Sequence, residues 1–188
     1  AASVRSMDAA VRAAFGDVEI LVANGGGPKP GAYGQTTPAD WDAAYRSTLR
    51  SMLDLIDGAL PGMRKRKWGR IVALTSSAVK QPIPNLVLSN AFRSALVATL
   101  KTLSIEVARE GITVNAIATG RVATERLREL YGDEEEMREA AEREVPIGRL
   151  ATPQEFAPLV VFLCGEPASY VTGQTIAVDG GLVRGLFG

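Results

Sequence analysis

The 188-residue sequence contains no histidine and only one cysteine, Cys164. The first absence excludes imidazole catalysis and histidine metal ligands, and the second excludes an internal disulfide. We predict no metal site, and a single unpaired cysteine indicates a reducing, cytoplasmic environment. Because Cys164 directly follows the apolar run 160–163, we expect its sulfur to be packed rather than reactive.

The sequence also lacks an excess of either charge and lacks a long apolar run. Lys plus Arg and Asp plus Glu both number 21, which favours neither nucleic acid nor an anionic membrane as a partner. No apolar stretch is long enough to cross a bilayer, and the start has no charged-then-apolar secretion pattern. With 46% hydrophobic and 22% charged residues, the composition is that of an ordinary globular domain.

Strand and helix patterns alternate along the chain. Short apolar runs typical of buried strands lie at 19–23, 69–75, 112–117 and 174–178. Helical patterns lie at 6–15, 37–63, 87–110 and 152–163. This alternation predicts βαβ units, so we expect an α/β fold with a doubly wound parallel sheet in three layers. No linker or repeat divides the chain, and we predict a single domain over residues 1–188.

Local signals refine three of the helical segments. Thr37-Pro38 and Thr152-Pro153 each begin a helix, because threonine caps a helix and proline suits its first position. The first of these helices is predicted to break near 58–62, where glycine and proline gather. The segment 125–144 is charged, helical and poor in apolar residues, so we expect a mobile flap that faces solvent.

Polar or glycine-rich segments follow the predicted strands, where ligands of doubly wound sheets bind. After the first strand, Gly25 and Gly26 either let the backbone approach a flat ligand or only form a turn. Asn24 either binds a ribose or holds the neighbouring strand. After the third strand, residues 120–124 either present backbone N–H groups and a hydroxyl to a carboxamide or phosphate, or form a plain loop.

At these strand ends the sequence resembles the short-chain dehydrogenase/reductase family, most closely its 3-oxoacyl-acyl-carrier-protein reductases. Residues 20–26 are similar to the family's strand that ends Asn-Asn-Ala-Gly. Residues 114–120 are similar to Val-Asn-x-x-x-Pro-Gly, with Thr119 in place of proline. The best matches are 146–150 and 172–181, and the resemblance covers essentially the whole chain.

The resemblance implies a Rossmann-type fold and an oxidoreductase that uses NAD or NADP on a small-molecule carbonyl or alcohol. A further implication is that the helices 41–60 and 87–110 pair in a homodimer or homotetramer. The small residues Ala91, Ala95 and Ala98 either suit close packing of such helices or only face their own sheet. The residues expected to bind the cofactor are Asn24, Gly25, Gly26, Arg93, Gly120, Val122 and Thr124.

The sequence departs from the family at its start. No G-x-G-x-x-G phosphate-binding loop occurs, and the first residues correspond to the helix before the family's fourth strand. We therefore expect the first three strands to be absent, which leaves strand 19–23 as a bare apolar edge. Either the chain is truncated, or it is natively short and a partner or strand exchange covers that edge. The residue that selects NAD or NADP follows the family's second strand, so the choice is not predicted.

The second departure concerns the family's catalytic Tyr-x-x-x-Lys. Ser89 stands at the tyrosine position, thirteen residues after Ser76, and Arg93 stands at the lysine position. Thr48 replaces the helper asparagine. By resemblance we expect Ser76, Ser89 and Arg93 at the catalytic centre, although Ser76 is otherwise a loop cap and the adjacent Ser77 is an alternative to it.

The function that follows is an NAD(P)-dependent oxidoreductase in which Ser76 polarises the carbonyl and Arg93 holds the ribose. Serine is too short and too weak an acid to replace a phenol directly, so the proton must come by way of water or an unusual residue. The alternative is a catalytically impaired family member that binds nucleotide or a protein partner without turnover.

Overall fold

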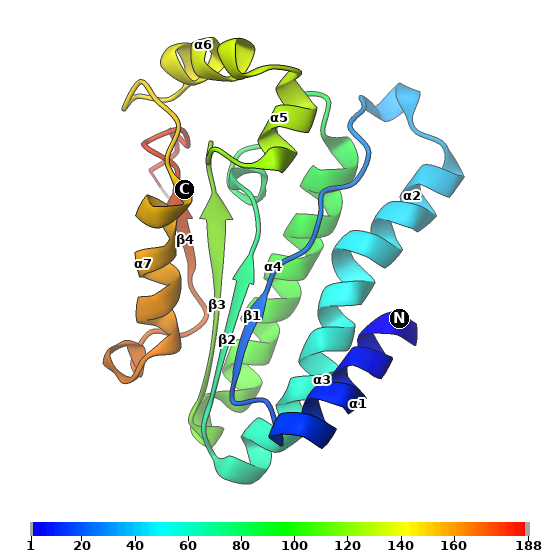
Figure 1. The fold of residues 1–188 in the computed structure, drawn as a ribbon, viewed down its shortest axis with the longest axis vertical. Helices are drawn as coiled ribbons and strands as arrows, with labels where there is room; N and C mark the ends of the chain where they lie inside the picture. Colours follow the sequence, from blue (N-terminus) through cyan, green and yellow to red (C-terminus); the bar gives the residue numbers. More distant parts are fainter. Residues whose placement is uncertain (1, 187–188) are drawn as a thin grey trace.

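The computed structural model describes residues 2–186 and contains a parallel sheet whose strands follow the order β1-β2-β3-β4 (Figure 1). The strands are β1 (Ile20–Ala23), β2 (Gly69–Leu74), β3 (Ile112–Thr119) and β4 (Thr175–Val178). Leu74 lies opposite Ile117, which lies opposite Ile176, so the carboxyl ends of neighbouring strands meet at one edge. β3 extends to Thr119, beyond its predicted end at 117.

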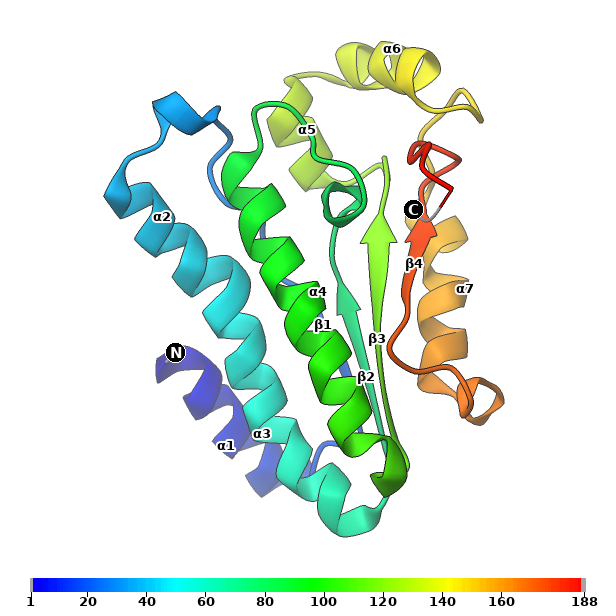
Figure 2. The same ribbon diagram turned by 180° about the vertical axis from the view of Figure 1, so that it is seen from behind.

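Helices cover both faces of the sheet (Figures 1 and 2). On one side lie α1 (Ala2–Phe15), α2 (Pro38–Ala44), α3 (Ser51–Arg66) and α4 (Val87–Val107), with α1 packed against α3. On the other side lies α7 (Pro153–Cys164), while α5 (Glu125–Tyr131) and α6 (Glu134–Glu144) sit above the carboxyl ends of the strands. Short 3₁₀ turns occur at Tyr33–Gln35, Ser77–Val79, Ala108–Glu110 and Glu166–Ala168. The predicted three-layer, doubly wound α/β fold is confirmed.

Two apolar clusters fill the spaces between the layers. The first joins β1, β2 and β3 to α3 and α4, with Ile71 and Leu96 among its fully buried members. The second joins the opposite face of the sheet to α7 through Val72, Ile117 and Leu163. Each strand of the sheet's centre is therefore apolar on both faces, which is why the sequence shows continuous apolar runs there rather than alternation.

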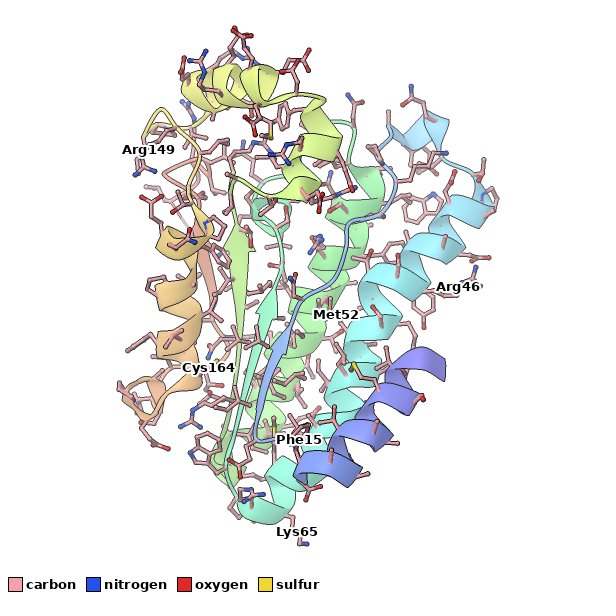
Figure 3. All side chains as sticks on the ribbon, in the orientation of Figure 1. Phe15, Arg46, Met52, Lys65, Arg149 and Cys164 are labelled. Atoms are coloured by element: carbon pink, nitrogen blue, oxygen red, sulfur yellow. The ribbon has the colours of Figure 1, made fainter. Side chains whose placement is uncertain are left out.

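The single cysteine belongs to the second cluster. Cys164 is half-buried at the end of α7 and packs with that cluster (Figure 3). Burial raises the pKa of its thiol, an effect that the positive charge of Arg70 partly opposes. A raised pKa keeps the sulfur in the unreactive thiol form, in line with the expected packing role.

Both predicted helix caps are present. The Thr37 side chain accepts a hydrogen bond from the Asp40 N–H group, and the Asp40 carboxylate accepts one from the Thr37 N–H group in return. Thr152 and Glu155 form the same reciprocal pair at the start of α7. These caps satisfy backbone donors that the first helical turn leaves free.

The predicted helix break near 58–62 is wrong. α3 runs unbroken through Pro61, and the irregular stretch is instead a π-helical segment, Tyr45–Arg50, between α2 and α3. Gly58 and Gly62 have a different purpose, because a Cβ atom at either position would collide with the side chain of Asp8 or Asp17. The two glycines allow the N-terminal segment to pack closely on α3.

The segment 125–144 is only partly as predicted. It forms two charged helices above the sheet, but each helix buries an apolar face that includes Leu127, Met137 and Ala141. The flap is therefore packed onto the strand ends rather than free in solvent.

β1 is an edge strand of the sheet. Its residues Ile20 and Val22 are 45% and 43% exposed, in line with the expected apolar edge. Within residues 2–186, no helix is both long and apolar enough to cross a membrane.

Candidate active site

Two adjoining cavities open at the carboxyl ends of the strands. The smaller one, which we call the serine cavity, has a volume of about 150 Å³ and is lined by Ser76, Ser77 and Ser89 among other residues. The larger one, which we call the glycine cavity, has a volume of about 740 Å³ and is lined by Asn24 and by Gly25, Gly26 and Gly27. The two cavities share a wall made of Gly27, Thr75, Arg93, Thr119, Val122, Thr124 and Arg126.

Ser76 enters the serine cavity from the end of β2. Its Oγ atom accepts a hydrogen bond from the Ala78 N–H group at 3.1 Å, which caps the following 3₁₀ turn. Because a serine hydroxyl both accepts and donates, this cap leaves its hydrogen available for a ligand. Loop capping and ligand binding are therefore compatible. Ser77 is buried beside it and lines the same cavity, so both serines remain candidates.

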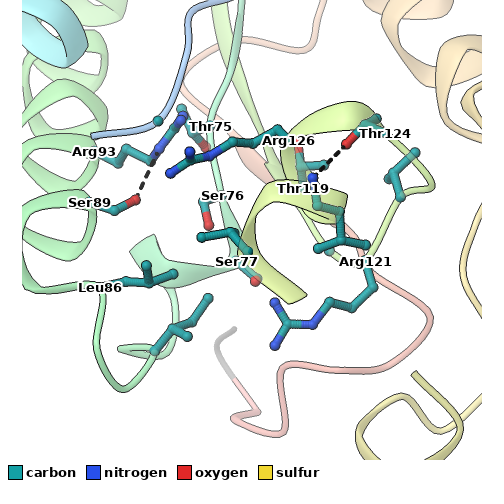
Figure 4. A pocket seen from close by; sticks show the side chains of 16 residues that line it. Thr75, Ser76, Ser77, Leu86, Ser89, Arg93, Thr119, Arg121, Thr124 and Arg126 are labelled. Carbon is teal, nitrogen blue, oxygen red and sulfur yellow. Dashed lines mark hydrogen bonds between the residues drawn. The ribbon is translucent and has the colours of Figure 1, made fainter. Parts of the chain in front are cut away.

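Ser89 and Arg93 reach the same cavity from α4, one helical turn apart (Figure 4). The Nε atom of Arg93 donates to the Ser89 Oγ atom at 3.2 Å. The other guanidinium nitrogens donate to the carbonyl oxygens of Leu74 at 3.5 Å and Gly26 at 3.4 Å. Arg93 therefore connects α4 to the ends of β1 and β2, and the three residues expected at the catalytic centre converge on one cavity.

The charge of Arg93 is held in an unfavourable environment. Burial lowers the pKa of its guanidinium, and the positive charge of Arg126 lowers it further. A cation in that position is stabilised by any negative charge that enters the cavity, whether on a ligand or on a developing oxyanion.

The three glycines after β1 are required for different reasons. A Cβ atom at Gly25 would collide with the Met52 side chain, and one at Gly27 would collide with the guanidinium of Arg126. Only Gly26 faces open space, with no atom within 4 Å of a Cβ atom built there. Position 26 therefore has room for the close approach of a flat ligand, whereas packed side chains surround the other two glycines.

Within residues 120–124, Val122 and Thr124 line both cavities, whereas Gly120 and Arg121 line the serine cavity alone. Part of this segment's hydrogen-bonding capacity is already used. The Gly120 N–H group donates to the Val178 carbonyl at 3.0 Å. The Thr124 hydroxyl accepts from the Leu127 N–H group at 3.4 Å and so caps α5. A threonine hydroxyl also donates, so this cap leaves its hydrogen available to a ligand in the cavities that Thr124 lines. Glycine is needed at 120 because a Cβ atom would strike the backbone of Asp179.

Two cavity residues, the arginines at 121 and 126, were not predicted from the sequence as site side chains. Arg126 lines both cavities (Figure 4). It also donates to the Pro28 carbonyl at 2.8 Å. Arg121 lines the serine cavity and pairs with Glu144 at 2.7 Å. Both residues lie next to or within the charged segment 125–144, whose composition indicated solvent exposure. Their nearness to Thr124 was the one available signal.

The site lacks two groups that the family's catalytic motif has, a tyrosine phenol and a helper asparagine. Tyrosine does not occur among the described residues that line the serine cavity. Thr48 is buried in the π-helical segment, and its hydroxyl has no hydrogen-bond partner among residues 2–186. Over the same residues, no group of three or more His, Cys, Asp or Glu side chains is placed to hold a metal ion.

Comparison with known proteins shows to which family the chain belongs. A sequence profile of the family described as Enoyl-(Acyl carrier protein) reductase matches residues 1–183. A 3-oxoacyl-[acyl-carrier-protein] reductase, FabG of Salmonella typhimurium, is 36% identical over 183 residues, which cover 96% of this chain and 73% of that protein. The chain belongs to the short-chain dehydrogenase/reductase family.

Further relatives within the short-chain dehydrogenase/reductase family show the same extent of match. An acetoacetyl-CoA reductase of Shinella zoogloeoides is 34% identical over 173 residues, covering 92% of this chain and 71% of that protein. The structure of L-sorbose reductase from Gluconobacter frateurii, complexed with NADPH and L-sorbose, superimposes with a TM-score of 0.90 at 32% identity. That match covers 97% of this chain and 73% of the sorbose reductase.

Proposed function

We propose that the chain is an NAD(P)-dependent oxidoreductase that interconverts a carbonyl and an alcohol, with a 3-oxoacyl reductase-like reaction. The observation that carries the proposal is the convergence of Ser76, Ser89 and Arg93 on one small cavity that shares a wall with a larger one. One cavity suits a reacting group and the other suits the reactive half of a dinucleotide.

The glycine cavity fits the nicotinamide half of NAD or NADP. Its volume of about 740 Å³ is typical of small-molecule sites, and Gly26 leaves its floor open to a flat ring. In this proposal Asn24, Gly25 and Gly26 border the ring and ribose, while Arg93 binds ribose hydroxyls. Val122 and Thr124 border the opposite side, and Gly120 lies next to them in the lining of the serine cavity. Bound there, the nicotinamide supplies a hydride to a carbonyl carbon, or accepts one from an alcohol.

Ser76 is proposed to bind the carbonyl oxygen. The Ala78 N–H group already occupies an acceptor site on its Oγ atom, so the hydroxyl hydrogen is directed to another acceptor. A hydrogen bond to the substrate oxygen strengthens as negative charge develops there during reduction. Ser76 therefore stabilises the oxyanion more than the ground-state carbonyl.

Ser89 and Arg93 are proposed to handle the proton. The Arg93 Nε–H group donates to Ser89, which leaves the serine hydroxyl hydrogen free to point into the cavity. Because serine alone is too weak an acid to replace a phenol, a water molecule bound to the Ser89 hydroxyl passes the proton to the developing alkoxide, and solvent returns H⁺ to that water. The adjacent buried cation of Arg93 stabilises the negative charge that develops along this relay. The net reaction adds one hydride to the carbonyl carbon and one proton to the carbonyl oxygen.

Two relatives support a carbonyl or alcohol as substrate. One is named as an acetoacetyl-CoA reductase and the other as a 3-oxoacyl-[acyl-carrier-protein] reductase. The sorbose reductase complex contains NADPH, which supports a nicotinamide cofactor without separating NAD from NADP.

The test is a direct assay for hydride transfer. The purified protein is mixed with NADH or NADPH and with acetoacetyl-CoA or 2-oxobutanoate, and loss of the reduced nicotinamide absorbance is followed. We expect Ser76→Ala to lower kcat at least tenfold, since oxyanion donors contribute about 10²–10³ in rate. Ser94→Ala, on the exposed side of α4, is the matched control and should keep the wild-type rate.

Ser77→Ala in the same assay identifies which of the two neighbouring serines acts. If Ser76→Ala turns over at the wild-type rate while Ser77→Ala does not, the role belongs to Ser77. A folded wild-type protein that oxidises neither cofactor with either substrate refutes the oxidoreductase proposal.

The replaced Tyr and Lys favour a second candidate, a family member that binds nucleotide or a protein partner without turnover. It rests on the specific finding that Ser89 and Arg93 occupy those positions with no tyrosine among the described lining of the cavity. Saturable binding of NADPH, measured by its fluorescence, without oxidation of NADPH by any substrate supports this candidate instead.

A further inference from the structure

Three arginine side chains line the serine cavity, namely Arg93, Arg121 and Arg126, and within the described chain no aspartate or glutamate lines it. Such an imbalance is unusual beside a cavity of only about 150 Å³, because guanidinium groups are always charged and repel one another. The lining itself is therefore positively charged, and a negatively charged ligand would be favoured in it.

The two acidic residues that pair with these arginines are not part of the cavity lining. Glu144 approaches Arg121 at 2.7 Å and Glu129 approaches Arg126 at 2.9 Å, and Glu129 is 62% exposed. Arg93 interacts with a serine hydroxyl and two carbonyl oxygens, all of which are neutral. Two of the three arginines are therefore paired with carboxylates, and the cluster keeps one net positive charge, on Arg93.

Arg126 is placed to use that charge on a ligand. It reaches from α5 across the cavity toward Arg93, above the two serines (Figure 4). Its guanidinium rests against Gly27, where any side chain would displace it, and its Nη2 atom donates to the Pro28 carbonyl. Its Nη1 atom donates to Glu129 at 2.9 Å, so a ligand carboxylate would meet the N–H groups that these two bonds leave free, held in a fixed plane.

We propose that the serine cavity takes a substrate whose reacting carbonyl carries a carboxylate close by, and that Arg126 is the residue that binds this carboxylate. The proposal rests on the function proposed above and narrows its substrate class to small oxo acids or hydroxy acids. The small volume agrees, because a cavity near 150 Å³ holds a molecule about the size of benzene. Arg93, on the opposite side, is then stabilised by the same negative charge.

The experiment measures binding rather than turnover. Dissociation constants are determined by ligand-observed NMR for 2-oxobutanoate and for its neutral methyl ester, with the wild-type protein and with Arg126→Gln. We expect the wild type to bind the acid at least tenfold more tightly than the ester. Arg126→Gln should remove that preference by weakening the acid alone.

Arg128→Gln is the matched control, because Arg128 lies on the same helix, pairs with Glu134 at 2.8 Å and does not line the serine cavity. It removes the same charge and should change neither dissociation constant more than twofold. Arg126→Lys keeps the charge but loses the planar group, and should retain part of the preference for the acid. Thermal melting of each variant establishes that it is folded.

Equal binding of acid and ester by the wild type overturns the proposal, as does an acid preference that survives in Arg126→Gln. A second ligand source is the phosphate of the cofactor, so binding of NADPH is measured for the same variants. If Arg126→Gln weakens NADPH tenfold and leaves 2-oxobutanoate unchanged, the residue binds the cofactor and the carboxylate proposal is wrong. Failure of hydride transfer leaves these binding results unaffected, so the two proposals fail separately.

Discussion

The Nε atom of Arg93 donates a hydrogen bond to the Oγ atom of Ser89 across 3.2 Å, one helical turn apart on α4. These are the two positions at which the family motif has lysine and tyrosine. This chain thus keeps a cation next to a hydroxyl group. Serine, however, is a shorter side chain than tyrosine, and its hydroxyl is a weaker acid. The pair is the most informative place to change the protein.

Restoring the family pair should raise catalytic activity. In Ser89→Tyr/Arg93→Lys, a phenol with an ordinary pKa of about 10 is placed beside a cation that lowers it. Because general acids contribute about 10²–10⁴ in rate, we expect kcat for carbonyl reduction to rise at least tenfold. The measurement is the rate of NADPH or NADH oxidation with saturating substrate.

Arg93→Lys alone is the control for that double variant and should not raise the rate, since it supplies no phenol. A folded double variant that binds cofactor but is no faster than wild type shows that the proton does not limit the reaction, contrary to the mechanism proposed for Ser89.

Removing the buried hydroxyl of Thr48 should stabilise the fold. The side chain is 2% exposed and its Oγ1 atom has no partner among the described residues. Valine has nearly the same shape and no unsatisfied polar atom, so Thr48→Val should raise the free energy of unfolding by about 1 kcal/mol. Urea denaturation followed by circular dichroism measures the change.

Thr99→Val on α4 is the comparison for Thr48→Val, because its hydroxyl is exposed and already bonded to the Ala95 carbonyl at 2.9 Å. That variant should not be stabilised. Destabilisation by Thr48→Val instead would mean that the hydroxyl is satisfied in solution.

The capping residue Glu155 should make stability depend on pH. Arg149 and the backbone N–H group of Thr152 lower the pKa of its carboxyl to about 2, against an ordinary value of 4.5. A lowered pKa stabilises the fold fully above pH 4.5, and this contribution disappears as pH falls toward 2. Glu155→Gln should therefore unfold at lower urea than wild type at pH 7, with the difference shrinking below pH 4.5.

The exposed Glu139→Gln on α6 removes a carboxyl with no recorded partner in residues 2–186 and should show no such pH-dependent difference. A constant gap between wild type and Glu155→Gln from pH 7 to pH 3 would assign the effect to the cap's hydrogen bonds rather than to charge.

The predicted pairing of helices between subunits can be tested on α4. Ala98 is exposed there, near Ile105, which is 73% exposed. A long charged side chain at 98 would prevent close approach of a second helix, so Ala98→Arg should convert dimers or tetramers to smaller species. Light scattering coupled to size-exclusion chromatography measures the mass.

Ala13→Arg places the same side chain on the exposed part of α1 and should leave the assembly unchanged. If Ala98→Arg elutes with the wild-type mass, the assembly does not use this face of α4.

Much of the fold was predictable because its signals are local. Apolar runs marked all the strands, and Thr37 and Thr152 marked helix starts by the residue pairs that form their caps. The break near 58–62 was mispredicted for a physical reason, since glycine and proline in a helix also serve close packing, which depends on the distant Asp8 and Asp17. The π-helical turn at Tyr45–Arg50 left no comparable local signal.

The candidate site divides in the same way. Ser76, Ser89 and Arg93 were located by spacing and resemblance, and they do line one cavity. Arg126 was not located, because its role depends on α5 folding back over the strand ends to reach Pro28. No periodicity in a charged helix distinguishes the one arginine that faces inward from its solvated neighbours.

The hydrogen bond between Arg126 and Pro28 also bears on how fast the cavity fills. That bond joins the helix above the cavity to the loop after β1, so a ligand that entered between these two segments would first have to break it. Association would then be limited by a protein motion rather than by encounter, and the observed rate would level off as ligand concentration rises. In Arg126→Gln, without the guanidinium, entry should become proportional to concentration, however weakly the ligand is then retained.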